Sequence, residues 1–386
     1  MTKKEKFITF EFVALWFVTF VAFCNVTVFY NLFPYLGTLG IAVELRGIIV
    51  GAYFLTSMVL YLLASPYLNA ANALRAMIVG TGIVVLCGFG YLIVNTFWGL
   101  VILRMVNGIG QFLLGAGATA LFVSVIPKEK SAHAFALYSI AILLPYGAVP
   151  ALMDLVNPHL PSVPYGYAAL SITFLPTTYL FRRLQRRNLV RREREIETNF
   201  PPFWTVWQEV LHGRTSFLLL TNLSYMINWS SMFFLYKGFA EKNGIPNVGS
   251  FFSVQMAVMI LIRLAMGRFF DAFPKGRLAA VTFAFIALGH TLFNHLPGSW
   301  AVPFIAILFG AGMGLGQPII NSLMFELSPP ARRAQNANLL LAAGQTGAFF
   351  GPILGGIIVA HLGYEGYFLF STLLALSTMV LCVKAF

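Results

Sequence analysis

Residues Leu278–Phe325 read LAAVTFAFIALGHTLFNHLPGSWAVPFIAILFGAGMGLGQPIINSLMF and contain no Asp, Glu, Lys or Arg. A helix needs about 20 mostly apolar residues to cross a bilayer, so this stretch is long enough for two spans. His295–Gly298, which includes a Pro and a Gly, is the point at which the chain turns between them. Strands of a membrane barrel would alternate polar and apolar residues, and this stretch does not. The sequence here predicts a pair of transmembrane helices.

Similar windows without charge recur along the whole chain of 386 residues. The composition is 59% hydrophobic and 10% charged, whereas a soluble domain carries roughly a quarter charged residues. This composition argues against a soluble enzyme, and its apolar content excludes a disordered chain. We predict an all-α membrane protein with twelve transmembrane helices. The expected spans are residues 10–35, 47–68, 76–96, 98–126, 132–156, 165–184, 215–240, 248–270, 277–295, 300–327, 332–361 and 365–384.

The basic residues indicate how the chain is oriented. Lys and Arg gather in the cytoplasmic loops of membrane proteins, and most of the 25 here fall in the inner segments when the N-terminus is placed inside. We therefore predict that both termini are cytoplasmic. The net charge of +12 is then a signal of topology, and no recognition motif supports nucleic-acid binding. The three Cys provide neither a disulfide framework nor a metal-ligand spacing, and we expect no metal and no cofactor.

The two halves of the chain match at a constant offset of 202 residues. Trp300, for example, follows Trp98 by this number of residues. The matched pairs are Trp98 and Trp300, Gly108 and Gly310, Gly110 and Gly312, Pro127 and Pro329, and Pro150 and Pro352. An ungapped repeat of this length predicts two similar six-helix bundles. We expect an N-terminal bundle at 1–184, a basic cytoplasmic linker at 185–214 and a C-terminal bundle at 215–386. The linker charges would favour the anionic lipids of the inner leaflet.

Residues Gly267–Arg277 (GRFFDAFPKGR) resemble the loop motif that follows the second helix of a half in the major facilitator superfamily. The resemblance implies that Asp271 accepts hydrogen bonds from helix N-terminal amides of the opposite half, where the helix dipole favours an anion. At the same cytoplasmic end, Glu326 balances Arg332. The first half has Asn69 where the motif has Asp. The expected gating residues are Gly267, Arg268, Asp271, Arg277, Glu326 and Arg332.

Two further stretches resemble motifs of the same family. Arg104–Gln111 is similar to its fourth-helix motif R-x-x-x-G-x-G, and Gly344–Gly356 is similar to its fifth-helix signature G-x-x-x-G-P-x-x-G-G. The resemblance covers essentially the whole chain and is to short, twelve-helix bacterial members of the drug- and sugar-efflux type. It implies a multi-pass, monomeric protein of the bacterial inner membrane that moves a small molecule by alternating access and is not an enzyme.

In this family helices 1, 4, 7 and 10 line the central cavity, which directs attention to their polar residues. The substrate-binding candidates are Asn25, Tyr30, Asn31, Arg104, Gln111, Asn228, Tyr236, Gln317 and Asn321, together with Arg263 on the eighth helix. An isolated Asn or Gln can equally join two helices. Arg104 and Arg263 have no basic counterpart at the repeat offset, and a guanidinium binds a carboxylate bidentately. We therefore expect an anionic substrate group, unless these arginines pair with backbone carbonyls.

The acidic residues bear on coupling to the proton gradient. No Asp or Glu lies deep in the expected spans of helices 1, 4, 7 and 10. Asp154, near the outer end of the fifth helix, is the candidate for proton coupling, and the alternative is that it pairs with a neighbour. His290 lies toward the outer part of the ninth helix, which packs peripherally in the fold that the resemblance implies, and is expected to be structural.

The function that we predict is proton-coupled efflux of a small organic molecule. The alternative is a uniporter, exchanger or importer of an organic anion such as a carboxylate, which the missing central carboxylates favour. An embedded enzyme would need a nucleophile, a metal cluster or paired carboxylates at membrane depth, and the sequence offers none. A receptor would usually add a soluble domain, and a channel would not need the Gly and Pro motifs of both halves.

Overall fold

The computed structural model describes residues 9–64, 67–68, 70–125, 131–186, 213–265, 273–296, 298–329 and 333–386. These residues are helical apart from short turns. The helices of the first half are α1 (Phe10–Thr27), η1 (Val28–Asn31), α2 (Leu32–Thr38), α3 (Val43–Leu63), α4 (Ala70–Gly90), α5 (Phe97–Val125), α6 (Ser131–Val156), η4 (Asn157–His159), α7 (Val163–Ile172) and α8 (Leu175–Arg186). Those of the second half are α10 (Arg214–Lys242), α11 (Val248–Ala265), α13 (Lys275–His295), η6 (Ser299–Ala301), α14 (Val302–Leu327) and α15 (Arg333–Ala385).

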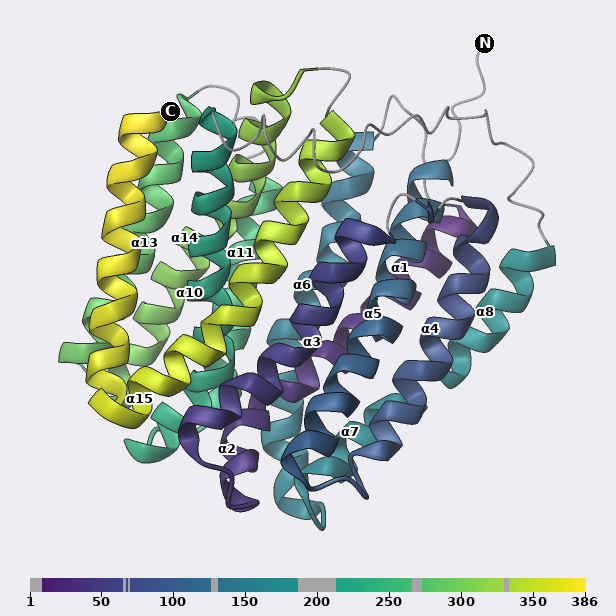
Figure 1. The fold of residues 1–386 in the computed structure, drawn as a ribbon, viewed down its shortest axis with the longest axis horizontal. Helices are drawn as coiled ribbons and strands as arrows, with labels where there is room; N and C mark the ends of the chain where they lie inside the picture. The colour runs from purple at the N-terminus through teal and green to yellow at the C-terminus, as the bar shows by residue number, and fades with distance from the viewer. Residues whose placement is uncertain are drawn as a thin grey trace.

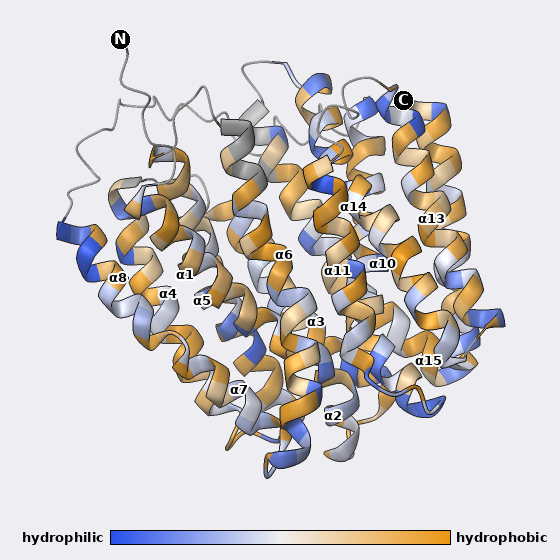
Figure 2. Ribbon diagram, turned by 180° about the vertical axis from the view of Figure 1, so that it is seen from behind, coloured by the Kyte–Doolittle hydropathy of each residue, from blue (hydrophilic) through white to orange (hydrophobic). Residues whose placement is uncertain are grey.

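The long helices run side by side between two ends of the molecule, as Figure 1 shows. The C-terminus of α15 lies at one end, called here the C-terminal end, and α2 and α7 lie at the other, called the Asp154 end. Hydrophobic residues cover the sides of the helices, while hydrophilic residues gather toward the two ends (Figure 2). Along the helices, side chains such as Leu86 on α4 and Leu373 on α15 are largely exposed. Lipid tails solvate such an apolar surface, and the backbone N–H and C=O groups of a helix form their hydrogen bonds within the helix.

The helices correspond to the predicted spans. By length and composition, nine helices of the described residues could cross a membrane. The last of these, Leu339–Ala385, contains two passes, because Gly363 has a φ of 69° and breaks α15. The predicted span 165–184 is divided into α7 and α8, and the predicted span 215–240 forms α10, whose Asn and Ser residues lower its hydropathy. The protein is an all-α membrane protein.

Helix contacts inside each half repeat at the 202-residue offset. A Cβ added at Gly108 would lie 2.5 Å from the carbonyl oxygen of Tyr53, and one added at Gly310 would lie 2.7 Å from that of Gln255. Tyr53 and Gln255 are themselves separated by the same offset. Helix α5 thus packs on α3 as α14 packs on α11, with glycine allowing the backbones to meet.

The contacts between the halves repeat in the same way. A Cβ added at Gly47 on α3 would overlap the backbone of Pro352 on α15, and one added at Gly249 on α11 would overlap the backbone of Ala151 on α6. One turn further along, Ser253 donates a hydrogen bond of 2.8 Å to the Gly147 carbonyl. Two backbone-to-backbone contacts related by the repeat therefore hold the halves together, and both lie in the part of the bundle nearer the Asp154 end.

We predict that Gly47→Ala separates the halves at the Asp154 end, because the added methyl has no room against the Pro352 backbone. Overpacking of this kind costs about 1–3 kcal/mol. Spin labels at positions 159 and 242, in a background without the three native cysteines, would report a longer distance by double electron–electron resonance. Gly82→Ala is the matched control, since a Cβ at Gly82 meets nothing within 4 Å. An unchanged distance distribution for Gly47→Ala would contradict the prediction.

Candidate functional site

Asp154 lies at the centre of a polar cluster between the halves. The Tyr30 hydroxyl donates to Asp154 Oδ1 at 2.5 Å, and Lys237 Nζ lies 3.3 Å from the same oxygen. The backbone N–H of Gly249 donates to Asp154 Oδ2 at 2.6 Å. Lys237 Nζ also lies 3.3 Å from the Tyr30 hydroxyl and 4.8 Å from the centroid of its ring. We call Tyr30, Asp154, Lys237 and Gly249 the Asp154 cluster.

The Asp154 cluster joins elements of both halves. Tyr30 and Asp154 belong to the first half, on η1 and α6, whereas Lys237 and Gly249 belong to the second, on α10 and α11. Only 15% of the Lys237 side chain and 17% of the Asp154 side chain are exposed, so water screens the ion pair weakly. Gly249 is in the first turn of α11, where the positive end of the helix dipole stabilises the carboxylate. In this conformation Asp154 is therefore paired with a neighbour, which was the alternative to a role in proton coupling.

The family resemblance implies an interaction of this kind for Asp271 at the cytoplasmic end, and the structure has such an interaction for Asp154 at the Asp154 end. Asp271, Gly267 and Arg268 lie outside the described residues, as does Arg332. Glu326 forms an ion pair with Lys275, and both belong to the second half. Arg277, near the start of α13, is exposed. The gating role of these residues stays a prediction.

Arg104 is almost fully buried, with 2% of its surface exposed. Its Nη2 donates to the Val50 carbonyl at 3.3 Å, while Nε and Nη1 form no hydrogen bond with the described residues. The guanidinium lies 4.5 Å from the ring centroid of Phe29 and 4.8 Å from that of Tyr53, which are distances of cation–π contact. Arg104 is therefore held inside the first bundle by two rings and one carbonyl.

Most other substrate-binding candidates make contacts within their own bundle. Asn25 donates to Ser171 at 3.4 Å and Asn31 accepts from Tyr167 at 2.9 Å, both on α7. Asn228 donates to the Ser224 carbonyl one turn earlier on α10. These contacts match the interhelical and intrahelical role that an isolated Asn can have. They leave the proposed contact with substrate untested.

The remaining candidates divide between the core and the surface. Tyr236 and Gln111 are buried, and the Tyr236 hydroxyl has no hydrogen-bond partner among the residues described. Arg263 is partly exposed on α11, and its buried Nε likewise lacks a partner in the described part of the chain. Gln317 donates to Asn321 at 3.1 Å on α14, and Asn321 is exposed. No described contact brings all the candidates to one place.

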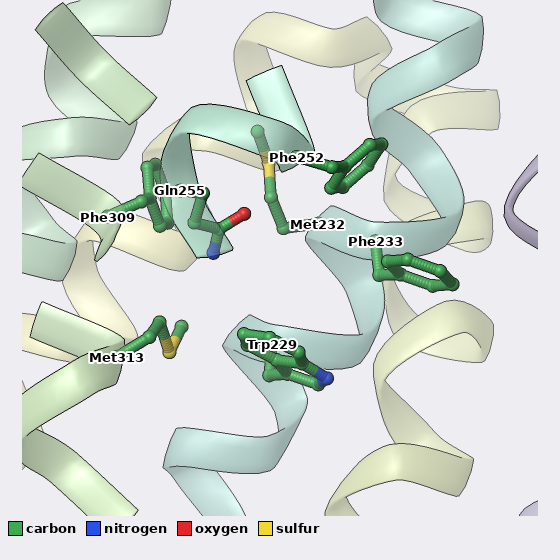
Figure 3. Close-up of a pocket in the computed structure, with 7 residues that line it drawn as sticks. All are labelled: Trp229, Met232, Phe233, Phe252, Gln255, Phe309 and Met313. Atoms are coloured by element: carbon green, nitrogen blue, oxygen red, sulfur yellow. The ribbon is translucent and has the colours of Figure 1, made fainter. Parts of the chain in front are cut away.

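A small cavity of about 10 Å³ lies in the second half (Figure 3). Its lining residues come from α10, α11 and α14: Trp229, Met232, Phe233, Phe252, Gln255, Phe309 and Met313. None of the substrate-binding candidates belongs to this set. Apart from Arg263, the candidates predicted from the sequence are polar residues on helices 1, 4, 7 and 10, and they include neither Gln255 on the eighth helix nor the aromatic residues. A lone Gln in the apolar run 248–262 was the signal that could have indicated it.

Comparison with known proteins fits this architecture. The profile of the Major Facilitator Superfamily matches residues 15–337 and 218–386. The chain belongs to this family. An uncharacterised MFS-type transporter of Bacillus subtilis, YfkF, is 25% identical over 336 residues, which is 81% of this chain and 80% of the relative. The staphylopine export protein of Staphylococcus aureus is 21% identical over 388 residues, covering 96% of this chain and 94% of the relative.

The solved structures agree on the fold. A variant of the nucleoside transporter NupG superposes with a TM-score of 0.79 at 14% identity, covering 97% of this chain and all of that one. The predicted family, the helical membrane fold and the exclusion of an enzyme are thus confirmed. The protein is a multi-pass membrane protein and a secondary transporter of small molecules.

Replacement of Arg104 separates a structural role from a functional one. We predict that Arg104→Met leaves the unfolding temperature unchanged or raised, because an apolar side chain of similar length removes a buried charge that has no carboxylate partner among the described residues. If Arg104 serves the substrate, transport is lost while the fold persists. Thermal unfolding and transport of the same preparation would be compared. A large fall in unfolding temperature would show that Arg104 is needed for the fold instead.

Proposed function

We propose that the protein exports a small organic molecule in exchange for protons, by alternating access between two six-helix halves. The observation that carries the proposal is the Asp154 cluster, an ion pair that closes one end of the bundle across the two halves. Alternating access requires contacts that can form in one state and break in the other. An ion pair with an ionisable partner provides such a contact, and its strength depends on protonation.

The described conformation fits a state that is closed at the Asp154 end. The backbone contacts of Gly47 and Gly249 and the Asp154 cluster all lie in that part of the molecule. At the C-terminal end, the ion pair of Lys275 and Glu326 stays within one half. With both termini cytoplasmic, as the Lys and Arg distribution predicts, the closed end faces outward. The cytoplasmic side would then be the side that opens to receive the substrate.

Protonation of Asp154 supplies the link to the proton gradient. The neutral acid loses its attraction for Lys237 and accepts more weakly from the Gly249 amide, so acid outside the cell favours opening outward. Glu241, just beyond the predicted span 215–240, also faces this region: partial burial raises the pKa of its carboxyl, and Lys237 opposes that rise. Lys237 thus has a second carboxylate nearby when Asp154 is neutral. The direction of transport follows the name of the Staphylococcus aureus relative, an export protein.

The alternative function is uniport, exchange or import of an organic anion such as a carboxylate. The buried guanidinium of Arg104 favours it, since its Nε and Nη1 have no partner within the described ranges. For both functions we propose a monomer in contact with membrane lipids. Proton-coupled export would in addition require that the protein bind and release protons.

We predict that Asp154→Asn opens the Asp154 end of the molecule. The amide keeps the size of the side chain but loses the charge that pairs with Lys237. Breaking such a partly buried pair costs about 2 kcal/mol, which shifts a two-state ratio roughly 30-fold. The label pair at 159 and 242 would show a larger population at long distance, and acidification would produce the same change in the wild type.

Glu365→Gln is the control for this experiment, because Glu365 is an exposed carboxyl outside the Asp154 cluster. Its distance distribution and its response to acid should match those of the wild type. If Asp154→Asn retained the short distance and the full response to acid, the Asp154 cluster would not be the closing contact.

Transport itself tests the coupling. Inverted membrane vesicles with an acidic lumen would be offered carboxylates, sugars and cationic drugs. We expect at least one compound to accumulate, because lumen acid stands for acid outside the cell, and we expect a protonophore to abolish the accumulation. Accumulation that survives the protonophore would support the uniport or exchange alternative.

A further inference from the structure

The cavity of the second half is lined in part by the counterparts of residues that contact Arg104 in the first half. Across the 202-residue offset, Arg104 corresponds to Ala306. Arg104 contacts the Val50 carbonyl and the Tyr53 ring, and the counterparts of these two residues, Phe252 and Gln255, line the cavity. The glycine contacts of both halves obey the same offset, so this correspondence holds in three dimensions. Ala306 has no long side chain that could lie against Phe252 and Gln255 as Arg104 lies against Val50 and Tyr53.

Gln255 is the single hydrogen-bonding amide among the residues that line the cavity. Gln255 is 4% exposed, and its side chain lines the cavity. Figure 3 shows its amide between the Phe309 ring and the side chains of Met232 and Phe252. Its backbone is held by α14, since a Cβ at Gly310 would lie 2.7 Å from the Gln255 carbonyl oxygen. A side-chain amide that faces an otherwise apolar cavity can bind a hydrogen-bonding group of a ligand.

The walls of the cavity select against charge. The lining residues are four aromatic side chains, two Met and Gln255, and none is ionisable in the physiological range. An ion placed among them would be buried without a partner, at a high cost in free energy. Aromatic rings gain from offset or edge-to-face contact with one another, and Met adapts its shape to the group beside it. The chemistry therefore suits an uncharged aromatic group.

Tyr146 of the first half packs against two of the rings that line the cavity. The Tyr146 ring on α6 lies 5.3 Å from the Trp229 ring and 5.1 Å from the Phe233 ring, centroid to centroid. The helix that carries Tyr146 also carries Asp154, so separation of the halves at the Asp154 end withdraws Tyr146 from these two rings. In the closed state the cavity has room for about one water molecule. Withdrawal of Tyr146, with rotation of Trp229 and the two Met, makes room for a ring.

We propose that this cavity is the closed form of a binding subsite for an uncharged aromatic group of the transported molecule, with Gln255 as its hydrogen-bonding contact and Tyr146 as its lid. The inference rests on the proposed transport function and names a chemical class for part of the substrate. Any anionic group of the same molecule lies outside this cavity.

Binding of single-ring probes tests the proposal. Purified protein in nanodiscs would be titrated with benzamide, benzoate, benzylammonium and cyclohexanecarboxamide, and binding measured by saturation-transfer difference NMR. Benzamide should bind more tightly than the two charged rings and the ring-saturated amide. Gln255→Leu should raise the Kd for benzamide about fivefold to tenfold, the usual effect of one neutral hydrogen bond. Met313→Phe should abolish binding by filling the cavity.

Gln345→Leu makes the same chemical change on α15, away from the lining residues, and should leave the Kd for benzamide unchanged. If Met313→Phe fails to fold, Gln255→Leu with its control decides the question. The proposal is overturned if no probe binds the wild type, if the charged rings bind as tightly as benzamide, or if Gln255→Leu and Gln345→Leu behave alike. The label experiment on Asp154 is independent of these probes, so the subsite and the transport function can fail separately.

Discussion

The close approach of backbones between the halves is the constraint on which the rest of the structure depends. Gly47 against Pro352 and Gly249 against Ala151 leave no space for a side chain, and the two contacts are related by the internal repeat. In a membrane there is little hydrophobic force to press helices together, so close packing and polar contacts hold them. The Asp154 cluster is built around one of these contacts, because Gly249 supplies both the close approach and the amide that the carboxylate accepts from.

The internal repeat has been used differently in the two halves. In the first half a guanidinium lies between Phe29 and Tyr53, whereas in the second half the counterparts of Val50 and Tyr53 line a small cavity together with aromatic rings. A symmetric scaffold thus carries a positive charge on one side and an adaptable apolar space on the other. Different side chains in the two halves allow a transporter to contact different groups of an asymmetric molecule. The backbone contacts between the halves are nevertheless related by the repeat.

The sequence predicts the fold well because membrane solvation imposes simple rules. Windows without charge reveal the spans, and the 202-residue offset anticipates contacts such as Gly108 with Tyr53. The candidate site was harder to predict. Asp154 could be singled out as an acidic residue near the outer end of the expected fifth helix, but nothing in the sequence marks Lys237 as its partner, since a pair between distant helices leaves no local pattern. The cavity was missed because its lining is mostly aromatic and Met side chains, and a search for polar residues does not detect space.

The hydrogen bond from Gly249 to Asp154 has a further consequence for α11. The first amides of a helix have no partner within the helix, and here one of them is satisfied by a side chain from the other half of the protein. The start of α11 is therefore capped by Asp154 of the other half, and this hydrogen bond would break if the two halves separated at the Asp154 end. In the proposed opening, water solvates the Gly249 amide and the first turn of α11 becomes prone to fraying. The proposed closure of the molecule would thus also order this helix end.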